Sequence, residues 1–106
     1  MVGWIALLFA GIFEIGWPVG LKMAQVPATR SSGILIAVGC MGVSGALLWF
    51  AQKSIPIGTA YAIWTGIGAA GTFLVGVMMY DDPTSIGRFL GVALIIGGVI
   101  TLKLAH

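Results

Sequence analysis

SIPIGTAYAIWTGIGAAGTFLVGVMMY, residues 54–80, contains no charged side chain along its whole length. A helix rises about 1.5 Å per residue, so roughly 20 apolar residues cross the ~30 Å hydrocarbon core of a bilayer. The stretch is longer than that requirement. We therefore predict a membrane-spanning helix over residues 56–80.

Three other stretches of the chain are also apolar enough to span a bilayer. Glu14 is the only charge in the first, and the second has none; the last is bounded by Arg88 and Lys103, whose long side chains can reach toward the interfaces. Of all residues, 59% are hydrophobic and only 8% are charged, and the mean hydropathy is +1.12. These values are typical of a membrane protein. We predict an all-α fold with a single four-helix transmembrane domain, residues 1–106, whose further spans are 2–21, 33–51 and 85–104.

Composition also argues against several classes of function. The net charge of +2 comes from five scattered cations with no basic run, so no nucleic-acid partner is expected. The one cysteine, Cys40, has no partner for an intrachain disulfide and is expected to pack as a small apolar residue. No metal-binding or catalytic motif is present, so we predict neither an enzyme nor a cofactor.

The distribution of basic residues gives almost no preference for one orientation in the membrane. With four spans, Lys53 and Lys103 share one face, while Lys22, Arg30 and Arg88 share the other. An excess of Lys and Arg normally fixes the cytoplasmic side, and here the counts are two and three. The alternative is a chance balance among few charges. We predict a chain of dual topology that forms an antiparallel homodimer, which supplies the inverted symmetry common in transporters.

Glycines mark helix faces where backbones can approach closely. Gly91 and Gly98 lie seven residues apart, with Ile95 between them on the same face of the fourth span. They predict a dimer contact between fourth helices, and packing within one chain is the alternative. Gly66 and Gly68 in the third span weaken the helix there and predict a bend.

Glu14 is the strongest chemical signal in the chain. Ionisable side chains within a membrane cost about 2.5–3.5 kcal/mol even on insertion scales and usually face a bundle interior or a water-filled cavity. Protons and an arriving cation then compete for the same carboxylate. Glu14 is therefore predicted to bind substrate and proton in turn, which couples the two fluxes as exchange. The alternative is a structural carboxyl that only joins helices.

The neighbours of Glu14 suggest the class of cation. Gly11 and Trp17 lie three residues before and after it on one helical face, and Tyr61 and Trp64 share a face of the third span. We predict that these residues line the site, although an interfacial aromatic belt is the alternative for the third span. A planar cation with several N–H donors suits carboxylates and aromatic walls. A quaternary ammonium drug also suits them.

At this point the chain resembles the small multidrug resistance family of proton-coupled exporters. The residues that carry the resemblance are AGIFEIGW (10–17), GLK (20–22), IPIGTAYAIWTGIGAAGT (55–72) and LKL (102–104). Trp17 and the TAYAIWTGIGA form of the third helix resemble the guanidinium exporter subtype, because the multidrug subtype has a small residue at the place of Trp17. The resemblance implies a guanidinium exporter of the bacterial inner membrane.

The resemblance also implies roles for individual residues. Glu14 would be the shared proton and substrate carboxylate, with Trp17 and Ser44 as its polar neighbours and Tyr61 and Trp64 as aromatic lining of the cleft. It further implies an antiparallel dimer, the bend at Gly66 to Gly68 and the contact from Gly91 to Gly98. The alternatives are a quaternary ammonium exporter of the same family and a membrane subunit without transport of its own.

Two features depart from the family pattern. Pro18 follows Trp17 where the subtype usually has a small helix former, and proline removes a backbone donor beside the site. Asp81, Asp82 and Pro83 stand in the third loop where relatives often have Gly-Glu or Lys-Glu. We expect this loop to lie outside the cleft.

Overall fold

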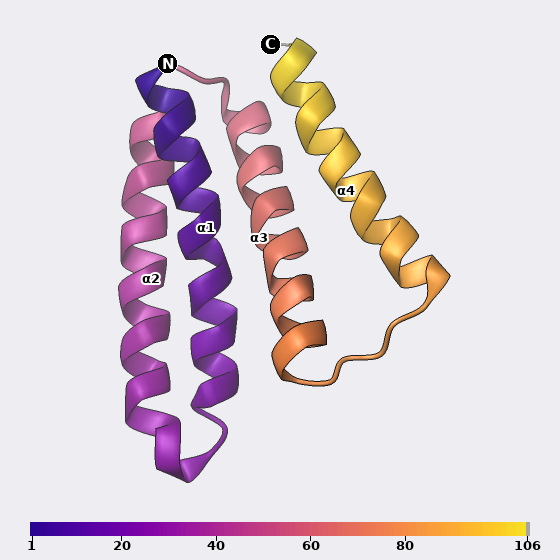
Figure 1. Cartoon of the computed structure of the whole chain (residues 1–106). Coiled ribbons are helices and arrows are strands. Elements are labelled where there is room, and N and C mark those ends of the chain that lie inside the picture. The colour runs from indigo at the N-terminus through magenta and orange to yellow at the C-terminus, as the bar shows by residue number, and fades with distance from the viewer. Residues whose placement is uncertain (106) are drawn as a thin grey trace.

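Four long helices account for nearly all of the residues that the computed structural model describes, 1–105 (Figure 1). Each is long and apolar enough to cross a membrane, so the prediction of an all-α protein with four membrane helices is confirmed. A short 3-10 helix, η1, precedes the second of them. The bounds are α1 Val2–Met23, η1 Pro27–Thr29, α2 Arg30–Ala51, α3 Ile57–Met79 and α4 Ile86–Ala105.

The helices at the first connection extend beyond the spans predicted from charge. Lys22 lies in the last turn of α1, and Arg30 is the first residue of α2. A cation in a last turn is stabilised by the partial negative charge at the helix C-terminus. The charges that ended the predicted spans therefore do not end the helices.

α1 lies between α2 and α3 and packs along both (Figure 1). Glycines permit the close approach to α2. A Cβ at Gly20 would lie 2.6 Å from the backbone nitrogen of Ala37 and 2.6 Å from the carbonyl oxygen of Gly33. Farther along, the Cys40 side chain rests on Gly16. Any larger residue at Gly20 would push α1 and α2 apart.

The buried core lies toward the end of the bundle where α1 begins and the α2–α3 connection crosses. Its members are small or branched apolar residues from three helices and that connection, with Leu7 only 1% exposed. Trp4, Trp64 and Val99 pack around them. The core residues are Ala6, Leu7, Ala51, Ile55, Ala60 and Ile63.

α4 diverges from the other helices and packs mainly on α3 (Figure 1). None of its residues is buried, and Leu94, in its middle, is 69% exposed. The Cα atoms span 44 × 34 × 16 Å, so the chain is a thin plate of helices. A plate of this thickness has no room for a closed channel within one chain.

Candidate functional site

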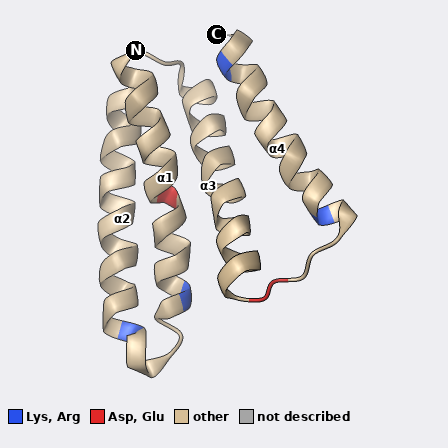
Figure 2. Cartoon of the chain, in the orientation of Figure 1, with Lys and Arg blue, Asp and Glu red and all other residues tan. Residues whose placement is uncertain are grey.

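Glu14 lies midway along α1 and is the one acidic residue within the four helices (Figure 2). The basic residues lie near the helix ends. The indole Nε1 of Trp17, one turn farther along α1, donates a hydrogen bond to Glu14 Oε1 at 2.6 Å. Within residues 1–105 no lysine or arginine pairs with the carboxylate. It is thus oriented by one donor and has an oxygen left to accept bonds from a ligand.

The side chain of Glu14 rests on α3 at Gly68. A Cβ added at Gly68 would overlap Glu14 Cγ and would lie 3.1 Å from Glu14 Cβ. Gly71, about one turn beyond Gly68 on α3, is covered in the same way by the side chain of Ile15. These glycines let α1 and α3 approach at the level of the carboxylate. α3 continues as a helix through Gly66 and Gly68, so the observed role of Gly68 is packing, and the bend remains a prediction.

A chain of hydrogen bonds connects the three packed helices one turn from Glu14. Trp64 Nε1 on α3 donates to Ser44 Oγ on α2 at 2.8 Å, and Ser44 Oγ donates to the carbonyl oxygen of Ala10 on α1 at 2.6 Å. Ser44 is 1% exposed, and both bonds satisfy its hydroxyl inside the bundle. Within one chain, Ser44 and Trp64 therefore bond each other and the backbone rather than Glu14.

Tyr61 and Gly11, which were also predicted to line the site, differ in how exposed they are. Tyr61 stacks against Trp64 with the ring centroids 5.4 Å apart and an angle of 52° between the ring planes. It is 56% exposed, so most of its ring faces outward from the plate. Gly11 is buried, and Ile67 of α3 covers it. In a single chain, Tyr61 is open to a ligand and Gly11 is not.

Within residues 1–105, Gly91 and Gly98 of α4 have no neighbours at their Cβ positions. Nothing lies within 4 Å of a Cβ built at Gly91 or Gly98. Gly66 on α3, by contrast, receives the side chain of Val99, where a Cβ would lie 2.5 Å from Val99 Cγ2. The α3–α4 contact therefore joins Gly66 to Val99 and Ile95, whereas the positions of Gly91 and Gly98 themselves are open.

Pro18 and Asp82, the two departures from the family pattern, are placed as follows. α1 continues through Pro18, which has no N–H and so gives the Glu14 carbonyl oxygen no partner four residues ahead. Asp82, expected to lie outside the cleft, turns back onto α3, where its carboxylate lies over Gly76. Proline was visible in the sequence; the return of the loop was not.

Comparison with known proteins adds an independent line of evidence. Residues 2–95 match the family model described as Small Multidrug Resistance protein. A protein named "Guanidinium exporter" from Proteus vulgaris is 46% identical over 104 residues, which cover 98% of this chain and 99% of that protein. Proteins of the same name from Salmonella typhimurium (strain LT2) and Yersinia pestis are 44% and 43% identical, and the matches cover 98% of this chain in both cases and 98% and 99% of those proteins.

Proposed function

Since the chain belongs to the Small Multidrug Resistance family, we propose that it exports guanidinium and small substituted guanidinium ions in exchange for protons. The family is one of multi-pass membrane exporters, not enzymes, and the four apolar helices fit the bacterial inner membrane. The observation that carries the proposal is the 2.6 Å bond from Trp17 to the mid-membrane carboxylate of Glu14.

That bond supports guanidinium as the substrate. With Oε1 held by the indole N–H, the plane of the carboxylate is fixed. A planar cation with parallel N–H donors gains from a fixed carboxylate plane, because it can make two hydrogen bonds in one orientation. A quaternary ammonium has no N–H donor and gains nothing from that plane. The names of the relatives point to the same ion.

Proton coupling follows from the use of one group for two ligands. The Glu14 carboxylate lies among apolar helices, and a charge in that position without a counter-ion is costly. A proton or a cation removes that cost, and each excludes the other from the same oxygens. If neither the empty nor the doubly occupied site changes orientation across the membrane, movement of the cation outward requires movement of protons inward.

The transporting unit in this proposal is an antiparallel homodimer with two Glu14 side chains. The chain is only 16 Å thin in one direction, and Tyr61 and the α4 glycines are open. A second copy that covers this surface would enclose the carboxylates. The near balance of two basic residues on one face against three on the other supports insertion of the copies in opposite orientations.

Transport by purified protein in liposomes tests the proposal. With a proton gradient imposed, guanidinium should move against its own gradient, and Glu14→Gln should abolish this movement without loss of the dimer. Ser32→Ala, on the exposed first turn of α2, serves as a control that leaves every charge in place. If only quaternary ammonium compounds produce a current, the substrate is a drug-like cation and not guanidinium. If neither kind of cation produces a current, the transporter assignment is overturned.

A further inference from the structure

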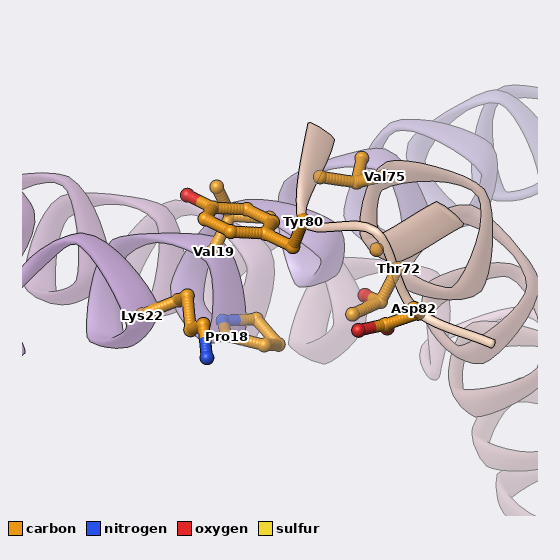
Figure 3. Close-up of a pocket in the computed structure, with 8 residues that line it drawn as sticks. Pro18, Val19, Lys22, Thr72, Val75, Tyr80 and Asp82 are labelled. Atoms are coloured by element: carbon orange, nitrogen blue, oxygen red, sulfur yellow. The ribbon is translucent and has the colours of Figure 1, made fainter. Parts of the chain in front are cut away.

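A cavity lies between α1 and α3, near the connection between α3 and α4 (Figure 3). Its volume is about 200 Å³. The polar side chains on its walls are Lys22 from α1 and Thr72, Tyr80 and Asp82 from α3 and the residues after it, and Pro18 forms part of the α1 wall. No residue predicted from the sequence as part of the substrate site lines this cavity.

The cavity continues the contact between Glu14 and Gly68 toward the membrane surface. Pro18 is four residues beyond Glu14 on α1, and Thr72 is four residues beyond Gly68 on α3. Four residues of α-helix advance about 6 Å along the axis and return to nearly the same face. The cavity therefore lies about one helical turn from the Glu14 contact, on the side of the α3–α4 connection.

The backbone after α3 holds the carboxylate of Asp82 at the cavity. Asp81 has a φ of 53°, a left-handed conformation that turns the chain back on the helix. The N–H groups of Tyr80 and Asp82 both donate to the carbonyl oxygen of Gly76 at 3.0 Å. The Asp82 carboxylate then lies directly over Gly76, where any side chain would collide with it. In the described part of the chain, no salt bridge neutralises this carboxylate.

The ends of α1 and α3 differ in how their partial negative charge is balanced. The C-terminus of a helix carries roughly half a negative charge, which favours a nearby cation. α1 has Lys22 in its last turn, whereas α3 has no basic residue in its last turn. The partial negative charge at the end of α3 and the Asp82 carboxylate thus both favour a cation bound beside them. α3 itself supplies no such cation.

Aromatic and hydroxyl groups complete the chemistry of the cavity. Lys22 Nζ lies 5.7 Å from the centroid of the Tyr80 ring, so a cation already occupies the neighbourhood of this ring. The Thr72 hydroxyl makes no hydrogen bond within residues 1–105 and is available to a ligand. The carboxylate and the hydroxyl can accept hydrogen bonds from a planar cation with N–H donors, whereas the Tyr80 ring is shared with Lys22.

We propose that this cavity, in the copy whose α3–α4 connection faces the side of uptake, is an entry site at which a guanidinium-class cation binds before it reaches Glu14, with Asp82 as its principal ligand. This proposal rests on guanidinium as the transported ion. Lys22 and Asp82 leave the cavity with no net side-chain charge, so binding is weak and the ion is released toward Glu14. Weak binding at successive sites is what rapid passage requires.

A binding measurement that does not depend on transport tests the entry site. The full-length Glu14→Gln protein, in lipid nanodiscs, is titrated with guanidinium chloride while the NMR signals of Asp82 and Thr72 are recorded, with sodium chloride at equal concentration as the reference. We expect saturable shifts with an affinity about tenfold or more below that of wild-type protein at Glu14. Adding Asp82→Asn should remove these shifts.

Asp81→Asn is the matched control. It removes the same charge from the adjacent residue, does not alter the cavity lining, and asparagine tolerates the left-handed conformation. Saturable shifts that persist in this variant and vanish with Asp82→Asn support the entry site. No saturable shift in Glu14→Gln, or equal loss with both loop variants, overturns it.

Transport separates this proposal from the proposed function. In liposomes, Asp82→Asn should lower the rate about threefold to tenfold at low guanidinium concentration and leave the maximal rate unchanged, because only entry is affected. A normal rate in Asp82→Asn overturns the entry site alone. If wild-type protein moves no guanidinium, the proposed function fails, and the NMR titration still decides whether the cavity binds the cation.

Discussion

The Glu14 side chain lies directly on the bare backbone of Gly68, so closely that a Cβ at position 68 would overlap Glu14 Cγ. The position of the carboxylate is thus set by the absence of a side chain on the neighbouring helix as well as by the Trp17 indole. The site depends on two contacts of Glu14. One is the hydrogen bond from Trp17 on its own helix, and the other is the packing against the bare backbone of Gly68 on α3.

Replacement of Gly68 by alanine should weaken guanidinium binding by about tenfold. The added methyl group forces Glu14 or α3 to move, and overpacking of this kind typically costs about 1–3 kcal/mol. The measurement is the guanidinium dissociation constant of the variant from intrinsic tryptophan fluorescence. Gly58→Ala, in the same helix with nothing within 4 Å of its Cβ, is the control. Equal dissociation constants for the two variants would show that the contact does not position Glu14.

Replacement of Trp17 by phenylalanine should reduce guanidinium binding and discrimination together. It keeps an aromatic ring but removes the N–H that donates to Glu14, and a hydrogen bond to a charged group contributes about 1.5–3 kcal/mol. The binding of tetramethylammonium, which has no N–H donors, should change less.

The control for this substitution is Trp49→Phe on α2, where the tryptophan is 64% exposed and contacts Lys53. Binding of both cations by titration calorimetry gives the ratio of affinities. An unchanged ratio of affinities in Trp17→Phe would mean that the indole N–H does not select guanidinium. Trp17→Gly would then be expected to retain selectivity as well.

Replacement of Ser44 by alanine should lower the free energy of unfolding by about 1–3 kcal/mol, because it leaves the Trp64 indole without its acceptor and removes a bond to the Ala10 carbonyl. Thermal unfolding in detergent, followed by circular dichroism, measures the effect. Ser32→Ala, on the exposed first turn of the same helix, should unfold like wild type. Identical unfolding of both variants would mean that the three-helix hydrogen-bond chain does not stabilise the bundle.

Replacement of Gly98 by leucine should disrupt self-association without disturbing the single chain. Within residues 1–105, nothing lies within 4 Å of a Cβ built at position 98, so we expect the substitution to act on a second copy or on lipid. Gly97→Leu is the control, since position 97 points about 100° away from the face shared by Gly91 and Gly98. Energy transfer between labelled copies in liposomes should fall only for Gly98→Leu. A similar fall for both would assign the effect to α4 generally, and no fall would exclude this face as the dimer contact.

The four helices could be predicted because a long stretch without charge has few other stable structures in a bilayer. Their ends could not, because Lys22 suits the C-terminus of α1 as well as a loop, and Arg30 at the start of α2 is held by a hydrogen bond to the Ala24 carbonyl oxygen that the sequence does not reveal. Glu14 and Trp17 were recognisable because both the rarity of a membrane carboxylate and the three-residue spacing are local features.

The parts that sequence reasoning missed depend on contacts between helices. Gly68 was interpreted as a point of weakness in α3, but which side chain lies on it depends on the register of α1 against α3. Asp82 lies in the loop after α3 as predicted, but nothing in its neighbours reveals that the chain turns back over Gly76. The sequence Asp81-Asp82-Pro83 indicates a turn but not the direction in which the chain turns. That direction follows from the left-handed backbone conformation of Asp81.

Competition for Glu14 predicts how guanidinium affinity depends on pH. Only the ionised carboxylate binds the cation, so below the pKa of the site the affinity should fall about tenfold for each pH unit, and above it the affinity should be constant. Guanidinium should therefore bind more tightly at higher pH. Dissociation constants measured across the pH range should follow this course in wild type and shift along the pH axis in Glu14→Asp. An affinity independent of pH would separate the proton from the cation site.

Proton release on binding tests the central claim that one carboxylate holds proton and cation in turn. Guanidinium chloride is added to purified wild-type protein in very weak buffer with a pH indicator, at a pH where the site is largely protonated. We predict that protons appear in the solution in proportion to bound guanidinium and that Glu14→Gln, tested identically, releases none. Guanidinium binding to wild type without proton release, or undiminished release from Glu14→Gln, would contradict the account.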